Sequence, residues 1–549
     1  MNDKSHASRR ASIILACIIA MQVIICIRYG ILKKGFFVDE LWGAGLANSY
    51  FRPRLFTPGI FNTNRYLPGS FFYNYLTVSQ DEGCSLASVW YNQSQDSHPP
   101  LYFLLYHILS CIKPGTFSKW TGLLINLVFL VGTNIYVFLT GTRMSNRWAG
   151  LAASALWGFS AEAVSYTLCA RMYMMAAFFI VLFFYRTLSY YELHGENNWK
   201  TRIYLMLATT GGCLTHYYFY IGAFVLAAIT CTYLYLKKGF RRACSYGFVV
   251  LGGVFLSWVI YPLIFVSLAH GDGRGREAIK NLLDLNSLWA RIGALVKQIE
   301  AKLLYRPVLI LVLVVLSLIV IIVILSILWK EQLNPCLKSR ISMLLVTETA
   351  FVLYMLTVAK LQPFNTNRYY FPITPLLWII ALGNLIAFKQ VLFTHIKRTD
   401  AAEKAVLAVM MLFLIIASSG VVFSHIHHKV MFLFPRQEQI LDQIKQGERH
   451  SALFIAAGKE YTITAHCLEL AQCSEAMCLD IGSEANLSEY DIHDEGNSLL
   501  VLADETLDQQ KLVDQILKQT AYSTYSLIGR GSGVWWEDVE ENYIYFFSK

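Results

Sequence analysis

The chain has 549 residues, of which 55% are hydrophobic and only 15% are charged, and its mean hydropathy is +0.44. A soluble protein of this length would need a more charged surface, so most of the chain must face lipid. The net charge of +9 is modest for this size and indicates cytoplasmic loops near anionic headgroups, not a nucleic-acid-binding surface. The twelve cysteines lack metal-type spacing, and whether Cys467, Cys473 and Cys478 pair stays open.

Apolar runs that cross a membrane need roughly 17–25 residues. The sequence has eleven such runs, near 11–28, 119–140, 148–165, 172–190, 202–217, 219–236, 245–268, 307–329, 341–359, 371–388 and 405–424. The first run follows a basic N-terminus and is not followed by a small-residue cleavage site. We therefore expect an uncleaved helix whose amino end lies inside.

The stretch 98–113, "HPPLYFLLYHILSCIK", decides on which side of the membrane every later loop lies. If it rests on the outer interface, four basic connections fall inside, as the positive-inside bias requires. These connections are 143–147, 237–242, 330–340 and 389–404. Few apolar residues remain between the two prolines and Lys113, so we predict that the stretch does not cross. Lys33 and Lys34 then fall outside and are the exception to the bias.

The predicted fold class is an α-helical polytopic membrane protein with about eleven transmembrane helices and a small C-terminal α/β soluble domain. We assign residues 1–425 to a transmembrane catalytic domain with a cytoplasmic N-terminus, and residues 426–549 to an extracytoplasmic domain. A first outer loop covers 29–118. Another outer loop, 269–306, has apolar residues at helical spacing, which predicts an amphipathic helix on the membrane surface.

In the tail, three short apolar runs predict β-strands, "ALFIAA" (452–457), "SLLVLAD" (498–504) and "NYIYFF" (542–547). They alternate with helical stretches such as "DETLDQQKLVDQILKQT". The "GRGSG" at 529–533 lacks dinucleotide-binding spacing, and we interpret it as a turn.

The notable polar residues all fall on the outer side in this topology. Asp39 and Glu40 in "FFVDELW" follow the first span, where adjacent carboxylates among aromatic residues suggest function. The others are His98 in "HPPLYF", Arg171 and Tyr173 in "CARMYMM", His216 and Tyr217 in "LTHYYFY", and Arg368 and Tyr369 in "NRYYFPITP". Each has an ordinary structural explanation, such as a solvated carboxylate pair, a capping histidine, a snorkelling arginine or an aromatic-belt tyrosine. Their joint placement favours a site for a phosphate-bearing amphiphile, because arginine binds phosphate bidentately and a nearby carboxylate can act as a base.

In this order, "DE", "HPPLY", "ARMY", "THYYF" and "RYYFPITP" resemble the GT-C glycosyltransferases, in particular the RgtA/B/C/D-like bacterial branch related to protein O-mannosyltransferases and lipid A aminoarabinose transferases. The likeness covers residues from about 30 to 390. It implies transfer of a hexose or pentose, with inversion, from a polyprenyl-phosphate carrier to a hydroxyl of a glycan, lipid or protein acceptor on the outer side. It makes Asp39 the catalytic residue that takes the acceptor's proton. Arg171 and Arg368, with His98 or His216, would then meet the charge of the departing phosphate.

The resemblance also leaves questions open. Glu40 either orients Asp39, binds the acceptor or helps to hold a cation. Members of the family commonly have an acidic residue two positions before the arginine of "ARMY", where this chain has Cys169, and Glu162 lies upstream. We therefore predict no obligatory cofactor, although a divalent metal is conceivable.

Rival interpretations are a transporter or flippase for a lipid-linked glycan, an anchored scaffold whose function lies in the tail, and a ligase that attaches whole polysaccharides. A transporter would carry ionisable residues near mid-membrane in several spans, whereas these gather at the outer edge.

Overall fold

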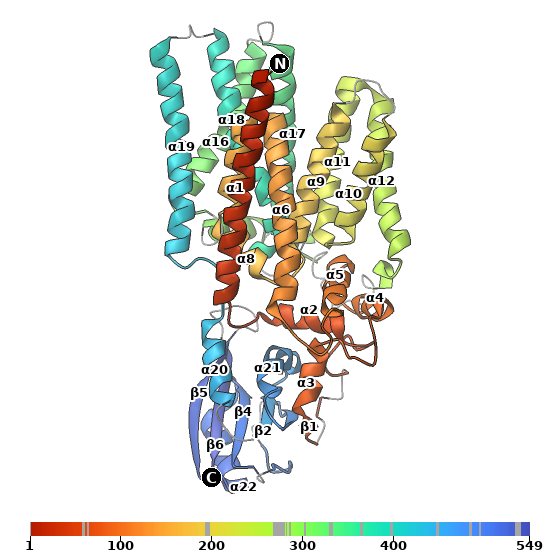
Figure 1. The fold of residues 1–549 in the computed structure, drawn as a ribbon, viewed down its shortest axis with the longest axis vertical. Coiled ribbons are helices and arrows are strands. Elements are labelled where there is room, and N and C mark those ends of the chain that lie inside the picture. Colours follow the sequence, from red (N-terminus) through yellow and green to blue (C-terminus); the bar gives the residue numbers. More distant parts are fainter. Residues whose placement is uncertain are drawn as a thin grey trace.

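The computed structural model describes residues 2–57, 61–62, 65–192, 198–266, 280–281, 283–284, 287–300, 304–328, 333–362, 366–395, 399–445, 450–482, 486–493, 496–532 and 540–549. Long helices lie side by side in a bundle (Figure 1). Short helices of the first loop and the C-terminal sheet lie together beneath one end of it. The N-terminus is at the opposite end.

Each of the eleven predicted runs coincides with one or two helices over most of its described residues. Nine of the described helices are long and apolar enough to cross a membrane. They are α1 (Asn2–Leu32), α6 (Lys119–Met144), α9 (Tyr173–Tyr191), α11 (Tyr217–Lys238), α12 (Phe240–Ile260), α16 (Arg306–Leu328), α17 (Pro335–Leu361), α18 (Thr374–His395) and α19 (Asp400–Ile426). The chain is thus a multi-pass α-helical membrane protein with a small C-terminal sheet domain.

The other two predicted runs form shorter helices. One becomes α10 (Trp199–Cys213), and the run 148–165 is divided into α7 (Arg147–Gly158) and α8 (Ala161–Leu168). At the break, the hydroxyl of Ser160 accepts a hydrogen bond from the Ala163 amide and so caps α8. Every residue of α8 is buried. A broken helix is tolerated at membrane depth because the protein, not lipid, surrounds its free backbone groups.

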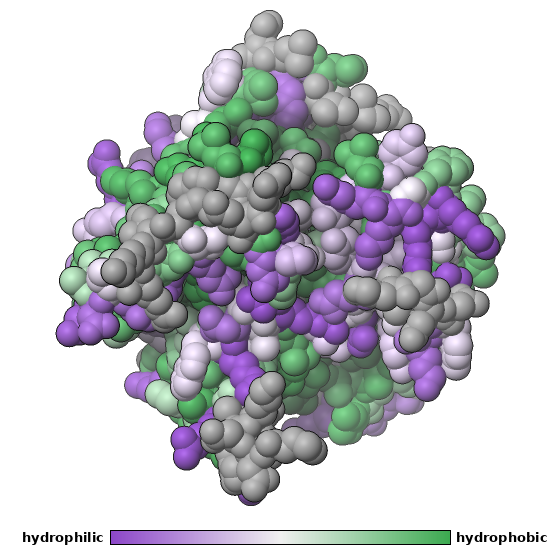
Figure 2. All heavy atoms as spheres, turned by 90° about the horizontal axis from the view of Figure 1, so that it is seen from above, coloured by the Kyte–Doolittle hydropathy of each residue, from purple (hydrophilic) through white to green (hydrophobic). Residues whose placement is uncertain are grey.

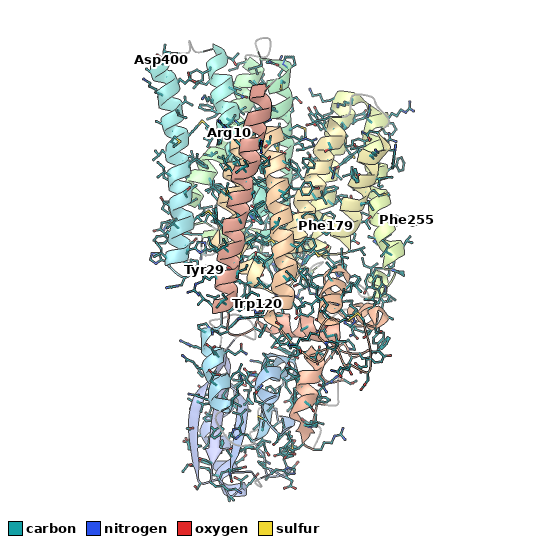
Figure 3. The ribbon with its side chains drawn as sticks, viewed as in Figure 1. Arg10, Tyr29, Trp120, Phe179, Phe255 and Asp400 are labelled. Carbon is teal, nitrogen blue, oxygen red and sulfur yellow. A yellow bond between two sulfur atoms is a disulfide. The ribbon has the colours of Figure 1, made fainter. Side chains whose placement is uncertain are left out.

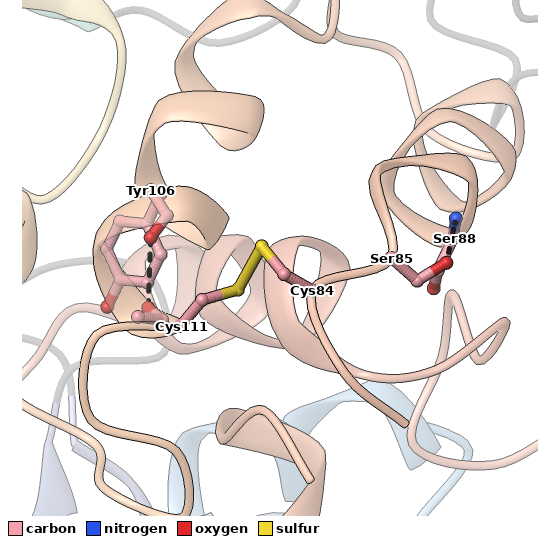
Figure 4. Close-up of a disulfide and its surroundings, with 6 residues drawn as sticks. Cys84, Ser85, Ser88, Tyr106 and Cys111 are labelled. Atoms are coloured by element: carbon pink, nitrogen blue, oxygen red, sulfur yellow. Dashed lines mark hydrogen bonds between the residues drawn. A yellow bond between two sulfur atoms is a disulfide. The ribbon is translucent and has the colours of Figure 1, made fainter. Parts of the chain in front are cut away.

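The described residues of the first loop, 29–118, form four short helices, α2 (Val38–Asn48), α3 (Gly69–Leu76), α4 (Leu86–Ser94) and α5 (Leu101–Ser110). The stretch whose crossing was in question forms α5, which has ten residues. Ten helical residues extend about 15 Å, half the thickness of the hydrocarbon layer. Helix α5 is therefore too short to cross. A disulfide between Cys84 and Cys111 ties its end to the start of α4 (Figure 4).

The tail contains a six-stranded sheet in the order β1-β3-β2-β4-β6-β5. Its strands are β1 (Leu67–Pro68), β2 (Ser451–Ala456), β3 (Glu475–Asp480), β4 (Ser498–Asp504), β5 (Thr524–Ser532) and β6 (Glu540–Ser548). The central strands β3, β2 and β4 are parallel, and the other pairs are antiparallel. The three predicted strands correspond to β2, β4 and β6. The turn predicted at 529–533 is wrong, because residues 529–532 belong to β5.

The first outer loop and the tail share one hydrophobic core. Strand β1 belongs to the loop and pairs with β3 of the tail. Side chains of α2, α3 and α5 form a single buried cluster with residues of α20 (Pro435–Lys445), η5 (Glu460–His466), α21 (Cys467–Leu470) and the sheet. The other face of the sheet is covered by α22 (Gln509–Gln519). The three tail cysteines are buried and free.

The predicted surface helix is described in part as α15 (Leu288–Gln298). Trp289 is exposed and Leu295 is buried, so this helix has one apolar face free and one packed, and it lies against α17. Ile279 and Leu282, which belong to the same prediction, lie outside the described residues.

Different residues mark the two ends of the bundle. Arg10 and Asp400 lie at the end that carries the N-terminus, whereas Tyr29 and Trp120 lie next to the tail (Figure 3). Viewed from the N-terminal end, hydrophilic side chains lie across the middle of this face, with hydrophobic ones around them (Figure 2).

Candidate active site

Asp39 lies in the first turn of α2, at the junction between the bundle and the tail. Its Oδ2 accepts a hydrogen bond from Nη1 of Arg368 at 2.6 Å. Arg368 belongs to the short helix η3 (Asn367–Tyr369), which precedes α18. The Asp39 side chain is 23% exposed and that of Arg368 is 9% exposed. The ion pair is therefore mostly buried but still reachable from one side.

Arg171 approaches Asp39 from the turn between α8 and α9. Its Nη1 donates to the backbone carbonyl of Asp39 at 3.0 Å. A Cβ atom on Gly43 would lie 3.0 Å from this nitrogen, so the glycine leaves room for the guanidinium against α2. Asn126 of α6 fixes the turn, because its amide donates to the carbonyl of Cys169 at 2.5 Å.

His98 lies on the other side of Arg171, just before α5. The two ring nitrogens of His98 are 3.4 and 3.5 Å from Nη2 of Arg171. Nδ1 of His98 is 2.7 Å from Oδ2 of Asp96. The rings of His98 and His216 are 5.9 Å apart, and those of Tyr173 and His216 are 5.7 Å apart.

His216 is held as a neutral imidazole. The Tyr218 amide donates to its Nδ1 at 3.0 Å, which leaves the proton on Nε2. Burial, and then the neighbouring His98, Arg171 and Arg368, place the pKa of His216 well below its ordinary value. His216 therefore acts as a neutral hydrogen-bond donor near neutral pH.

Both arginines keep their charge in spite of burial. Burial alone would lower the pKa of Arg368, but Tyr173, Tyr369 and Asp39 raise it well above its ordinary value. The same holds for Arg171, whose pKa is raised by Asp39, Tyr173 and Asp96 against the effect of burial. Two fixed positive charges with planar donor arrays suit a phosphate group.

The tyrosines divide into two groups. Tyr369 stacks on Tyr218 with ring centroids 4.7 Å apart, and the guanidinium of Arg368 lies 5.2 Å from the Tyr369 ring centre. Tyr217 instead packs against the apolar cluster around Leu214 and Tyr261. Tyr218 therefore borders the site, and the role expected of Tyr217 stays a prediction.

Glu40 points away from the cluster that surrounds Asp39. Its Oε2 accepts from Nζ of Lys33 at 2.9 Å and from the Phe37 amide at 2.8 Å. Its Oε1 accepts from the Ala170 amide at 2.7 Å. Lys33 in turn donates to the carbonyl of Phe432 at 2.8 Å. These contacts tie Glu40 to the segments that carry Asp39 and Arg171, and the roles left open for Glu40 stay predictions.

Glu162 helps to hold the turn that carries Arg368. It is buried in α8, and its Oε1 lies 3.5 Å from the side-chain nitrogen of Asn367. The hydroxyl of Tyr166 donates to the side-chain oxygen of Asn367 at 2.6 Å. Because Asn367 precedes Arg368, these contacts fix the turn that presents the arginine.

Sequence reasoning missed Asp96 and Tyr218. Asp96 stands two residues before His98 in "QDSHPP", the spacing of a side chain that caps a turn, and this was the available signal. Tyr218 is one of four aromatic residues in a row, 217–220, and the sequence alone does not tell which of them faces inward.

The charged side chains of the site fit a divalent cation poorly. Asp39 faces Arg368, Asp96 faces His98, and Glu40 faces Lys33. Within the described ranges, the one group of three side chains close enough to share an ion is Cys84, His107 and Cys111. That group lies elsewhere in the first loop, and its two cysteines form the disulfide.

Comparisons with known proteins give structural matches alone, since no family model and no curated protein matches the sequence. ArnT from Cupriavidus metallidurans bound to undecaprenyl phosphate aligns with a TM-score of 0.46 and 10% identity over 97% of each chain. An oligosaccharyltransferase from Archaeoglobus fulgidus, in complex with Zn and sulfate, aligns with a TM-score of 0.48 and 10% identity over 89% of this chain and 68% of that one.

The protein O-mannosyltransferase Pmt1-Pmt2 complex of S. cerevisiae, bound to its sugar donor, aligns with a TM-score of 0.36 and 14% identity. The match covers 47% of this chain and 33% of that chain, so this chain spans about a third of its length. All three matches are GT-C enzymes, the superfamily that the motifs resemble. At these scores and identities, the matches assign no activity to this chain.

Proposed function

We propose that this protein is a membrane glycosyltransferase that moves a sugar from a polyprenyl-phosphate donor to an acceptor hydroxyl on the outer side, with inversion. The observation that carries the proposal is the convergence of Asp39, Arg171 and Arg368. They come from segments up to 329 residues apart in sequence, yet they form direct contacts. The carboxylate and the arginines meet at the junction of the bundle and the tail, where the Asp39 side chain is 23% exposed.

The proposed reaction follows from these contacts. The acceptor oxygen attacks the anomeric carbon from the face opposite the phosphate, and the carbon–oxygen bond to the phosphate breaks. The electron pair remains on the phosphate, which leaves as an anion. Arg171 and Arg368 stabilise this anion, and the neutral His216 adds a hydrogen bond from Nε2. Asp39 lies beside both arginines and takes the proton of the acceptor hydroxyl as the oxygen bonds to the anomeric carbon.

Three features support a site on the outer side. The described residues of the basic connections lie at the N-terminal end of the bundle, opposite the site, as the positive-inside bias requires of the cytoplasmic end. The disulfide of the first loop is stable in an oxidising compartment. Lys33 and Lys34, which broke the bias, are paired with Glu40 and Glu438 respectively.

A transporter is less well supported by the described residues. The ionisable groups meet at one end, and α17 contributes a carboxylate deep in the bundle, Glu348, which accepts from the Asn384 amide at 2.9 Å. A single capped carboxylate does not form a pathway.

The proposal is tested by mass spectrometry of envelope glycans and glycoproteins from cells with and without the chain. We expect one sugar addition to disappear with the chain, to return with the wild type and not to return with Asp39→Asn. Asp81→Asn, an exposed carboxylate of the same loop, serves as the matched control and should restore the addition. Identical glycans in all strains would overturn the proposed function.

A further inference from the structure

Helices α11 and α12 pack against each other at one edge of the bundle (Figure 1). Together they line a groove of about 580 Å³, the α11–α12 groove. Its floor consists of small residues, Cys231, Ala243 and Gly247, and bulkier residues stand at its sides, where Phe240 is 71% and Phe248 is 73% exposed. A Cβ atom on Gly247 would lie 3.6 Å from Sγ of Cys231, an ordinary contact distance. The glycine therefore leaves space in the groove that a larger side chain would fill.

The length of the α11–α12 groove matches one leaflet of a bilayer. The groove begins at Phe240, the first residue of α12, and extends to Leu251. At a rise of about 1.5 Å per residue this stretch covers roughly 16 Å, which is half of a hydrocarbon layer of about 30 Å. Its opening lies at the end of the bundle that carries the N-terminus, where the rings of Tyr235 and Phe240 approach to 6.4 Å between centroids. An acyl chain that reaches from headgroup level to the middle of the bilayer therefore fits the groove.

The turn at the opening of this groove is strongly basic. Four basic residues flank the glycine that joins α11 to α12, namely Lys237, Lys238, Arg241 and Arg242. Lys238 donates to the backbone carbonyl of Tyr191. Among the described side chains, no carboxylate pairs with Lys237, Arg241 or Arg242. Viewed from this end, hydrophilic side chains gather on the side of the bundle where α11 and α12 lie (Figure 2). An apolar groove and a set of positive charges without counter-charges thus meet at one level of the membrane.

We propose that the α11–α12 groove binds one anionic phospholipid from the leaflet at the N-terminal end of the bundle. An acyl chain lies over Gly247, and Arg241 and Arg242 bind the phosphate, because a guanidinium group donates to two phosphate oxygens at once. Basic pockets beside membrane helices attract anionic headgroups, whereas the ammonium group of a zwitterionic lipid would be repelled by the same charges. The site is separate from the cluster around Asp39, and the inference does not rest on the proposed transferase function.

Two other occupants of the groove are disfavoured by its charges and its position. A second copy of this chain, in a two-fold contact at the groove, would bring the four basic residues of both copies together. The proposed polyprenyl-phosphate donor has its phosphate partners, Arg171 and Arg368, at the opposite end of the bundle. An anionic phospholipid brings negative charge to the turn and an apolar chain to the groove, so it satisfies both parts of the site.

The test is native mass spectrometry of the purified full chain in detergent, after incubation with equal amounts of phosphatidylglycerol and phosphatidylcholine. We expect phosphatidylglycerol to be retained in preference to phosphatidylcholine, and a phosphatidylglycerol with a diazirine in its acyl chain to crosslink within residues 231–251. The double variant Arg241→Gln and Arg242→Gln should lower the retention of phosphatidylglycerol roughly tenfold. Gly247→Leu keeps the charges but fills the groove, so it should remove the crosslinks in this segment.

The start of α1 offers a matched control at the same end of the bundle. Arg9 and Arg10 are both exposed, and Arg10 lies at this end in Figure 3. The double variant Arg9→Gln and Arg10→Gln removes the same charge and should leave retention and crosslinks unchanged. Equal retention of the two lipids, or crosslinks that persist in Gly247→Leu, would overturn the proposal. So would a dimer that Gly247→Leu dissociates, because the groove would then hold a second copy.

Discussion

The buried ion pair of Lys33 and Glu40 allows a test of whether Glu40 stabilises the fold or takes part in the reaction. Their side chains are 3% and 1% exposed, and Glu40 accepts three hydrogen bonds. In Glu40→Gln the ammonium of Lys33 loses its counter-charge, and the new amide nitrogen faces a donor. Removal of one partner from a buried ion pair costs roughly 3–5 kcal/mol. We expect about 3 kcal/mol, because Lys33 keeps its bond to the Phe432 carbonyl.

The assay is thermal unfolding of the purified protein in detergent. Glu40→Gln should lower the unfolding midpoint by about 2–3 °C, and Lys33→Met with Glu40→Gln should recover part of the loss. The exposed pair of Lys34 and Glu438 is the control, since Glu438→Gln should cost at most about 1 kcal/mol. At temperatures below its unfolding midpoint, the Glu40→Gln variant should still transfer sugar. If the variant has the unfolding midpoint of the wild type but no longer transfers sugar, this reasoning is refuted and Glu40 takes part in the reaction.

Two further predictions follow from the site and the topology. Arg171→Lys should raise the KM for the donor more than the KM for the acceptor, because lysine lacks the planar fork that binds phosphate, and equal changes in both constants would indicate a structural role. Phe240→Cys, at the exposed start of α12, should react with an impermeant thiol reagent after the membrane is opened and not before. The measurement needs a variant background that lacks the exposed Cys17 and Cys336. Labelling in intact cells would show that the topology is the opposite of the predicted one.

The sequence was sufficient for much of the fold. Apolar length located all nine candidate spans among the described helices, because spans must be long and continuous in lipid. The break at Ser160 was not predicted, because the flanking residues stay apolar and the shift from one helix to two depends on tertiary packing. Strand β3 was missed because "EAMCLD" has no alternation, as expected of a strand buried on both faces.

The sequence predicted which residues form the candidate site better than it predicted the contacts between them. Asp39, Arg171 and Arg368 carry costly charges near lipid, which made them recognisable as single residues. Their partners depend on three-dimensional contacts between distant segments. Glu40 and Asp39 are neighbours in sequence, yet a helical turn directs them to opposite sides, one to Lys33 and the other to Arg368.

The two-residue strand β1 has a consequence for the history and engineering of this chain. Residues 67–68 belong to the first loop but complete the edge of the C-terminal sheet. A tail grafted from a related protein would thus arrive without its own edge strand and would have to accept a foreign one. Chimeras should exchange residues 67–76 together with the tail, and natural lineages should have altered the two segments in step.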